Sequence, residues 1–253
     1  MDVYFNNIRR LLSESRKAVE HYKMIADGDR IAVGISGGKD SLSLLCILYS
    51  LREFLPYSFD LVALTADMGF PGSDYSPIAE FCEKMGIPFE CVHTQLGEII
   101  FDVRKEKNPC SLCSRMRRGI LHEAVQKLGC NKLALGHHFD DVVDTFMLNL
   151  FYEGRLGSFS PVTYLSRRGI TLIRPMVYVP EKDIRYFVSK NDLPIQTSLC
   201  PADKNTERES MKKLLAELEK NNKGLRPRIF LALEKAGIDG YSLSEDRSEP
   251  DDK

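Results

Sequence analysis

The sequence predicts an α/β fold built on a parallel sheet, and three observations support this. Short apolar segments with the character of buried strands alternate with helical segments between residues 28 and 174. Several of these segments are joined by turns of only a few residues, as in right-handed βαβ units. The chain has 253 residues, of which 43% are hydrophobic and 28% charged, so it can bury a large core.

The order of the elements follows from the apolar pattern. Residues 4–25 carry apolar side chains at helical spacing among charges, which predicts a surface helix. Apolar runs predict strands at residues 30–36, 60–66, 88–93, 132–136 and 171–174. Helices are expected between them at residues 41–51, 74–85, 113–128 and 140–151 and, after Pro180, at residues 181–191, 206–221 and 226–236.

One main domain with appendages accounts for this order. We expect an N-terminal helix in residues 1–27, a ligand-binding domain in residues 28–200 and a helical region in residues 201–238. Residues 239–253 hold six acidic and two basic residues with Ser and Pro, which predicts a disordered acidic tail. Functional residues are expected at the carboxyl ends of the strands, where parallel sheets bind ligands.

Charge and apolar content exclude several classes of protein. The formal net charge is −1, so the overall charge favours neither a nucleic-acid partner nor a membrane surface. The apolar runs are too short to cross a bilayer, and the charged first 25 residues do not form a signal peptide. The seven cysteines suit metal or redox chemistry better than a disulfide framework. We therefore expect a cytoplasmic protein with no membrane partner.

A phosphate-binding loop is predicted where the first strand meets its helix, at Ser36-Gly37-Gly38-Lys39-Asp40-Ser41. The glycines let the backbone approach phosphate oxygens, and the helix that follows presents unpaired N–H groups. Lys39 adds a positive charge, and Asp40 could hold the magnesium that accompanies phosphates. The common NTPase loop is different, because Ser or Thr directly follows its Lys.

A second polar stretch, Gly136-His137-His138-Phe139-Asp140-Asp141, follows the fourth strand. Its histidines and carboxylates alone would suit a metal site or a general base. Together with the loop it resembles the PP-loop family of N-type ATP pyrophosphatases, which implies an adenine-nucleotide α-hydrolase-like, Rossmann-like domain in residues 28–200. The resemblance implies magnesium at Asp40 and Asp141. It implies ATP binding by Gly34, Ser36, Gly37, Gly38, Lys39, Asp40, Ser41, Asp67, Gly136, His137 and Asp141.

Three cysteines form a candidate metal site. Cys110 and Cys113 are about one helical turn apart where a loop meets a helix. Cys200, in a loop beside a proline, is the best third thiol, and no second C-x-x-C is present to complete a zinc site. Three thiolates without an obvious fourth ligand suit an iron–sulfur cluster with one open iron. The remaining cysteines lie in apolar segments, at Cys46, Cys82, Cys91 and Cys130.

Longer motifs resemble the tRNA 2-thiocytidine synthetase family. They include residues 109–119 around the C-x-x-C, Asn149-Leu-Phe-Tyr-Glu-Gly154, Ile173-Arg-Pro-Met176 and Glu181-Lys-Asp-Ile184. The resemblance implies a 4Fe-4S cluster on Cys110, Cys113 and Cys200. It further implies ATP-dependent thiolation of cytidine 32 in tRNA, with release of AMP and pyrophosphate. Lys39 and Asp40 would assist the reaction, and a cysteine desulfurase or another sulfide donor would supply sulfur. A homodimer is also expected.

Basic residues gather in two segments that could contact RNA. Residues 101–132 hold eight Lys or Arg and three Asp or Glu, and residues 155–190 hold seven and two. Arg115, Arg117 and Arg118 lie beside the C-x-x-C, where a phosphate backbone would pass. Unpaired bases could stack on aromatic side chains of the second half of the chain, Phe151, Tyr152, Phe159 and Tyr164. Two solvated basic faces with core aromatics would explain the same composition.

Other functions stay open at this point. A PP-loop iron–sulfur thiolase or desulfidase acting on uridine or on a free thiolated base has the same motifs. A non-catalytic nucleotide-binding iron–sulfur sensor would bind ATP without releasing AMP or pyrophosphate. Lysidine-type ligation uses the same loop but does not need the three cysteines.

Overall fold

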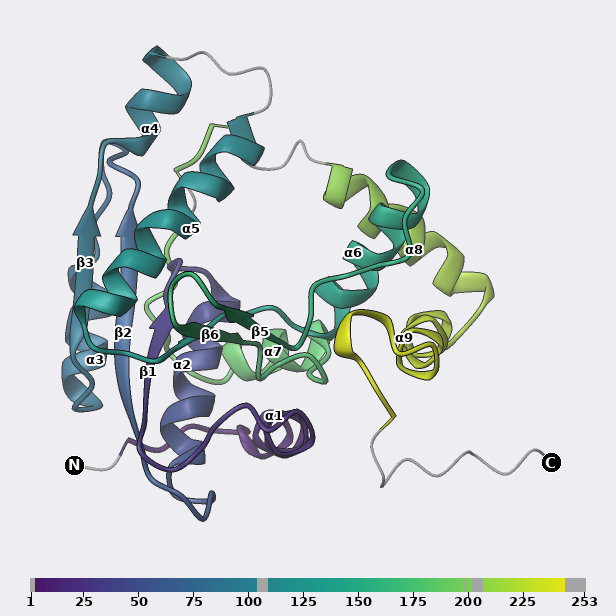
Figure 1. The fold of residues 1–253 in the computed structure, drawn as a ribbon, viewed down its shortest axis with the longest axis horizontal. Helices are drawn as coiled ribbons and strands as arrows, with labels where there is room; N and C mark the ends of the chain where they lie inside the picture. The colour runs from purple at the N-terminus through teal and green to yellow at the C-terminus, as the bar shows by residue number, and fades with distance from the viewer. Residues whose placement is uncertain (1–2, 104–108, 198, 202–206, 244–253) are drawn as a thin grey trace.

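The structure is a computed structural model that describes residues 3–103, 109–197, 199–201 and 207–243. A six-stranded sheet has the order β3-β2-β1-β4-β6-β5 (Figure 1). The strands are β1 Asp29–Gly34, β2 Phe59–Asp67, β3 Phe89–His93, β4 Lys132–Ala134, β5 Val162–Leu165 and β6 Ile170–Ile173. All pairings are parallel except that of β5 with β6. The predicted α/β fold on a parallel sheet is confirmed, with an antiparallel edge strand that was not predicted.

The helices follow the predicted order with shifted ends. They are α1 Arg9–His21, α2 Lys39–Leu51, α3 Ser76–Lys84, α4 Leu96–Glu98, α5 Pro109–Lys127, α6 Phe139–Tyr152, α7 Glu181–Val188, α8 Glu207–Asn221 and α9 Leu225–Lys235. A π-helical turn, Ile99–Val103, follows α4, and a 3₁₀ turn, Ile238–Gly240, follows α9. The segment that contains α4 and the π-helical turn was not predicted. Helix α5 begins at Pro109 instead of Cys113, so both cysteines lie in its first turns.

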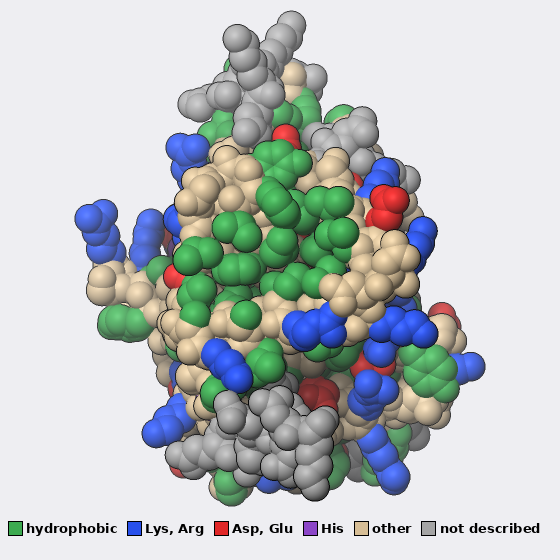
Figure 2. Space-filling model, turned by 90° about the vertical axis from the view of Figure 1, so that its right-hand side faces the viewer, with side chains coloured by type: hydrophobic (Ala, Val, Ile, Leu, Met, Phe, Trp, Pro, Cys, Tyr) green, Lys and Arg blue, Asp and Glu red, His purple; other side chains and the backbone are tan. Residues whose placement is uncertain are grey.

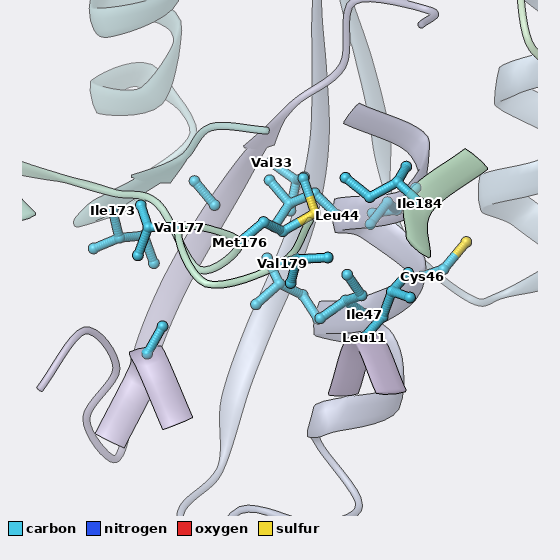
Figure 3. Close-up of a cluster of buried hydrophobic side chains, with 14 of the residues drawn as sticks. Leu11, Val33, Leu44, Cys46, Ile47, Ile173, Met176, Val177, Val179 and Ile184 are labelled. Carbon is cyan, nitrogen blue, oxygen red and sulfur yellow. The ribbon is translucent and has the colours of Figure 1, made fainter. Parts of the chain in front are cut away.

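The sheet is covered on both faces by apolar layers. Along β1, Ile31 and Val33 point to one layer and Ala32 to the other, as the alternation of a strand requires. The larger layer contains the buried faces of α1, α2 and α7, and Figure 3 shows Val33 with Leu44 of α2 and Ile184 of α7 in one cluster. The smaller layer packs α5 against the sheet. Burial on both faces explains why the parallel strands read as nearly continuous apolar runs.

The strand order creates a crevice between β1 and β4. The chain runs from β1 outward to β3 and then returns to place β4 on the other side of β1. Loops that leave neighbouring strands in opposite directions open a crevice at their carboxyl ends. The predicted phosphate loop follows β1 and the predicted histidine stretch follows β4, so both lie at this crevice. The amino end of α5, with its two cysteines, lies on the same side of the sheet (Figure 1).

The C-terminal helices pack onto the main domain beside α6. Helices α8 and α9 contact α6, and the Phe230 ring lies 4.9 Å from that of Phe139. Tyr241 is only 1% exposed, and the Asp239 carboxylate accepts a hydrogen bond of 2.6 Å from the Ser158 N–H. The prediction of an unpacked tail from Asp239 onward is therefore wrong as far as Leu243, and residues 244–253 lie outside the described part. No described helix has the length and apolar content needed to cross a membrane.

Candidate nucleotide and thiol site

The phosphate loop is held open by its own serines. Gly37 has a φ of +81°, which glycine adopts without strain, and α2 begins directly after Gly38. The Ser41 hydroxyl accepts hydrogen bonds of 3.1 Å from the Ser36 N–H and the Ser36 hydroxyl. It donates one of 2.9 Å to the Gly38 carbonyl. This arrangement leaves the amino end of α2 facing the crevice, which suits an anion such as pyrophosphate.

Lys39 is surrounded by carboxylates at the start of α2. Its ammonium nitrogen lies 2.8 and 2.9 Å from the two Asp40 oxygens and 2.9 Å from the Glu181 Oε1. Burial alone would raise the pKa of Glu181, but the hydrogen bond and charge of Lys39, with smaller effects from Lys212 and Arg185, lower it to about 2. Glu181 was not predicted as a site residue. Its sequence signal was only its place in the Glu181-Lys-Asp-Ile184 motif.

The stretch after β4 lies directly against the phosphate loop. A Cβ on Gly136 would lie 3.1 Å from the Asp40 carbonyl carbon and from the Ser41 nitrogen, so a larger residue there would push against the phosphate loop. His138 caps α6, accepting a hydrogen bond from the Asp141 N–H while the Asp141 carboxylate accepts one from the His138 N–H. The His138 Nε2 lies 3.8 Å from an Asp40 oxygen and 3.5 Å from an Asp141 oxygen. Asp40 and Asp141, the two predicted magnesium ligands, therefore both lie near the His138 Nε2 atom.

Two arginines from the C-terminal helices reach the acidic residues of α6. The Arg226 guanidinium lies 2.8 Å from an oxygen of the fully buried Asp144 and 3.3 Å from an Asp140 oxygen. Arg208 lies 3.7 Å from an Asp141 oxygen. Sequence reasoning missed both arginines, because nothing local in their helices indicates a distant carboxylate. They make the helical region 201–238 part of the site's surroundings.

His137 is enclosed behind the nucleotide site. Its ring centroid lies 4.7 Å from that of Phe159, and the Arg174 guanidinium stacks 5.1 Å from the same Phe159 ring. Burial and the nearby Arg174 charge lower the pKa of His137 to about 4. Its Nδ1 has no hydrogen-bond partner among the described residues. A neutral imidazole with one ring nitrogen uncommitted is therefore present at the crevice.

Asp67 lies one strand away from the phosphate loop, at the end of β2. Its carboxylate accepts a hydrogen bond of 2.9 Å from the Gly69 N–H and lies 3.1 Å from the His93 Nδ1. The Thr65 hydroxyl, two residues earlier, donates to the Ile35 carbonyl at the start of the loop. The end of β2 thus supports the loop, while the contacts of Asp67 itself are with the turn toward β3.

The three candidate thiols differ in exposure. Cys110 is exposed, and Cys113 and Cys200 are half-buried. Burial raises the pKa of Cys113, the Cys200 and Cys110 charges raise it further, and Arg117 opposes them. Within the described residues, no three His, Cys, Asp or Glu side chains stand in an arrangement that would hold a metal. Buried positions were predicted correctly for Cys46, Cys82 and Cys130, while Cys91 is half-buried.

The segment before Cys200 is joined to the phosphate loop. The Gln196 N–H donates a hydrogen bond of 2.9 Å to the Gly37 carbonyl. A Cβ on Gly37 would lie 3.0 Å from the Gln196 Oε1, so this side chain packs directly on the loop. Sequence reasoning missed Gln196, which carries no local signal. The contact places the third thiol only four residues from a residue that touches the nucleotide loop.

The predicted RNA-contact arginines separate onto two sides of α5. Arg117 affects the pKa of Cys113 and therefore lies on the side of the thiols. Arg118 lies beside His122 on α5, and both face Arg168. Arg168 belongs to the turn between β5 and β6. The Gln126 amide fixes that turn by donating 2.7 Å to the Arg168 carbonyl. Arg115, like Arg118, is exposed. The two basic segments of the sequence thus meet at one surface.

The aromatic side chains suggested for base stacking differ in exposure. Phe151 and Tyr152, at the end of α6, are each 59% exposed, and Tyr164 on β5 is 66% exposed. Phe159 is partly buried and contacts His137 and Arg174. Figure 2 shows hydrophobic side chains gathered on the side of the molecule that carries α8 and α9, with Lys and Arg around them.

Comparison with known proteins agrees with this site. Residues 9–218 match the PP-loop domain family. A tRNA-cytidine(32) 2-sulfurtransferase of Geobacter sulfurreducens is 42% identical over 91% of this chain and 91% of its own length. One from Pelobacter propionicus is 42% identical over 89% and 85%. The solved structure of the U34-tRNA thiolase NcsA from Methanococcus maripaludis, with its [4Fe-4S] cluster, is 27% identical and superposes with a TM-score of 0.74 over 88% of this chain and 77% of its own. The chain therefore belongs to the PP-loop family and, within it, to the family of the tRNA-cytidine(32) 2-sulfurtransferases.

Proposed function

We propose that this protein uses ATP to replace the C2 oxygen of cytidine 32 in tRNA with sulfur, giving 2-thiocytidine. The observation that carries the proposal is the hydrogen bond from Gln196 to Gly37, four residues before Cys200. It ties the segment before Cys200 to a loop suited to pyrophosphate. Activation by ATP and delivery of sulfur to the same base require such proximity.

The first half of the reaction is assigned to the loop and to the stretch after β4. The cytidine O2 attacks the α-phosphate of ATP, and pyrophosphate leaves while the loop N–H groups and Lys39 bind it. Asp40 and Asp141 would hold magnesium on the phosphates, since both carboxylates approach the His138 ring. Gly34, Gly136, His137 and Asp67 complete the proposed nucleotide site. Adenylation turns a poor leaving oxygen into part of AMP.

The second half of the reaction is assigned to the cysteines. Cys110, Cys113 and Cys200 would hold a 4Fe-4S cluster by their donor chemistry, and Cys113 lies near enough to the other two for their charges to raise its pKa. Such a cluster would supply a site for soft sulfide without a net redox step. Sulfide adds to C2 of the adenylated base, and the C–O bond breaks so that AMP departs with the original oxygen. Arg115, Arg117 and Arg118 are proposed to bind the tRNA backbone near this point.

Several further properties belong to the same proposal. A cysteine desulfurase or another sulfide donor supplies the sulfur, and the reaction takes place in the cytoplasm, where unmodified tRNA is present. The protein acts as a homodimer. None of these alters the chemistry assigned to the residues above.

The direct test is a thiolation assay without oxygen. The protein is incubated with ATP, magnesium, sulfide and unmodified tRNA, and the digested nucleosides are analysed by mass spectrometry. We expect 2-thiocytidine from the natural protein and none from Cys200→Ala, because one of the three thiols is lost. Cys82→Ala is the matched control, since this buried cysteine lies in α3. Thiolation that persists in Cys200→Ala would contradict the assigned ligand.

A uridine thiolase is the second candidate, because NcsA acts on U34 and shares 27% identity with this chain. The same assay separates the two candidates. A 2-thiouridine product would keep the chemistry and overturn the cytidine assignment. ATP turnover without any thiolated nucleoside in tRNA would instead direct attention to free thiolated bases.

A further inference from the structure

Glu181 faces the phosphate loop from a distant part of the chain. It is the first residue of α7, about 140 positions after Lys39 in the sequence, yet its Oε1 lies 2.9 Å from the Lys39 nitrogen. Only 17% of its side chain is exposed. We propose that Glu181 is a positioning residue whose carboxylate holds Lys39 in the nucleotide-free protein and is exchanged for a phosphate oxygen when pyrophosphate or ATP binds.

Lys39 has no hydrogen-bonding capacity left over in this state. An ammonium group has three N–H donors, and Lys39 has three close carboxylate oxygens, two from Asp40 and one from Glu181. A phosphate oxygen can therefore bind the ammonium only by displacing one of them. Asp40 belongs to the loop and is tied to Lys39 through both oxygens. Glu181 contributes a single oxygen from another element, so it is the partner that gives way.

The carboxylate keeps a partner after the exchange. The same Oε1 atom of Glu181 accepts a hydrogen bond of 3.0 Å from Arg185, one turn further along α7. Arg185 is 67% exposed, so it can follow the carboxylate away from the loop. The Glu181 Oε1 atom thus contacts both cations at once, and it keeps Arg185 when a phosphate oxygen replaces it on Lys39.

The backbone of α7 does not need to move for this exchange. The Glu181 N–H donates a hydrogen bond of 2.7 Å to the Asp140 carboxylate, which fixes the start of α7 to the start of α6. Pro180, just before it, limits the backbone further. The exchange is therefore a rotation of the Glu181 side chain. The free energy needed to break its contact with Lys39 lowers the affinity of the loop for ATP and for pyrophosphate. Glu181 weakens product binding and so assists pyrophosphate release.

The test measures the affinity for pyrophosphate and for ATP with magnesium by titration calorimetry on the full chain. Glu181→Gln keeps the shape but removes the charge that competes for Lys39. We expect both ligands to bind about tenfold more tightly, the size of one charge-assisted hydrogen bond. Glu181→Asp is the second variant, which keeps the charge but falls short of Lys39, and we expect tighter binding there too. Glu14→Gln, at the surface pair with Lys17 on α1, is the matched control and leaves both affinities unchanged.

The dependence on Lys39 distinguishes exchange from simple repulsion. In a Lys39→Met background, Glu181→Gln should no longer tighten binding, because the ammonium that both anions compete for is gone. The inference is overturned if Glu181→Gln weakens binding or leaves it unchanged, or if the same tightening appears without Lys39. It rests on the proposed function only in requiring that the loop binds pyrophosphate. If the natural protein binds neither ligand, the nucleotide assignment itself fails.

Discussion

The imidazole of His137 is a single residue whose charge the fold controls. It lies against Phe159 and near the buried Arg174, and burial together with that positive charge lowers its pKa to about 4. A histidine in the unfolded chain has a pKa near 6.5. His137 is therefore neutral in the fold throughout the physiological range, and it can offer a hydrogen bond to a base or nucleotide without adding a positive charge.

This shift predicts how stability depends on pH. Between about pH 6.5 and pH 4 the unfolded chain takes up a proton at His137 that the folded protein does not. The free energy of unfolding contributed by this residue is therefore fully present above pH 6.5 and decreases as the pH falls through that window. The decrease amounts to up to about 3 kcal/mol. Urea unfolding at pH 7 and pH 4.5 measures this decrease in the free energy of unfolding. His137→Gln should remove most of the difference between the two pH values, and an unchanged difference in that variant would contradict the assignment.

Individual site residues could be predicted from the sequence only where they are neighbours in the chain. The phosphate loop is six consecutive residues, and its chemistry is visible in their types and order. Glu181, Gln196 and Arg226 were missed because each meets its partner through the tertiary fold. Nothing in a local stretch around them indicates which distant group they contact.

Helix α5 is the element that joins the thiols to a basic surface. It begins with Cys110 and Cys113 and extends for 19 residues, with Arg118 and His122 one turn apart on the side of Arg168. The hydrogen bond from Gln126 fixes the turn between β5 and β6 against its far end. A tRNA backbone lying along this side of α5 would contact Arg118 and Arg168.

This arrangement predicts the salt dependence of tRNA binding. Arg118→Gln with Arg168→Gln should weaken binding and reduce the slope of log affinity against log salt by about 1 to 2, since two phosphate contacts are lost. Arg16→Gln with Lys17→Gln on α1 is the matched control, and its slope should not change. Binding measured by fluorescence anisotropy between low and high salt gives both values. An unchanged slope in the first variant would show that tRNA binds elsewhere.

Elements differ in how well their sequences predict them. The parallel strands were predicted because burial on both faces gives a nearly continuous apolar run. The long helices were predicted because burial on one face gives a helical period of apolar residues. The edge strand β5 has four residues, all half-buried or exposed, so its apolar signal is weak. Helix α4 with the π-helical turn after it is short, and it is held by a distant segment: the Gly97 N–H donates to the carbonyl of Met68, just after β2.

At the scale of the molecule, the segment after α1 packs against the segment after α9. Tyr22, after α1, lies 6.1 Å from Tyr241 and accepts a hydrogen bond of 2.9 Å from the Tyr178 hydroxyl. Phe230 of α9 packs edge-on against Tyr241 and at a tilt against Phe139. The sequence suggested an N-terminal helix and a C-terminal helical region as separate appendages, because composition does not reveal such long-range aromatic packing. In the structure these two regions pack together and support α6, the helix that carries Asp140 and Asp141.

Tyr241 is the position at which this closure can be tested. It is 1% exposed, and its hydroxyl has no hydrogen-bond partner among the described residues. Tyr241→Ala should lower the free energy of unfolding by about 3 kcal/mol or more, because it removes a buried ring and leaves a cavity. Tyr241→Phe should be neutral or stabilising, since it removes only an unpaired buried hydroxyl. Leu243→Ala, at a side chain that is 39% exposed, is the control and should cost little. Urea unfolding of the three variants measures this order. If Tyr241→Phe proved as costly as Tyr241→Ala, the hydroxyl would have a partner and the ring packing would not explain the closure.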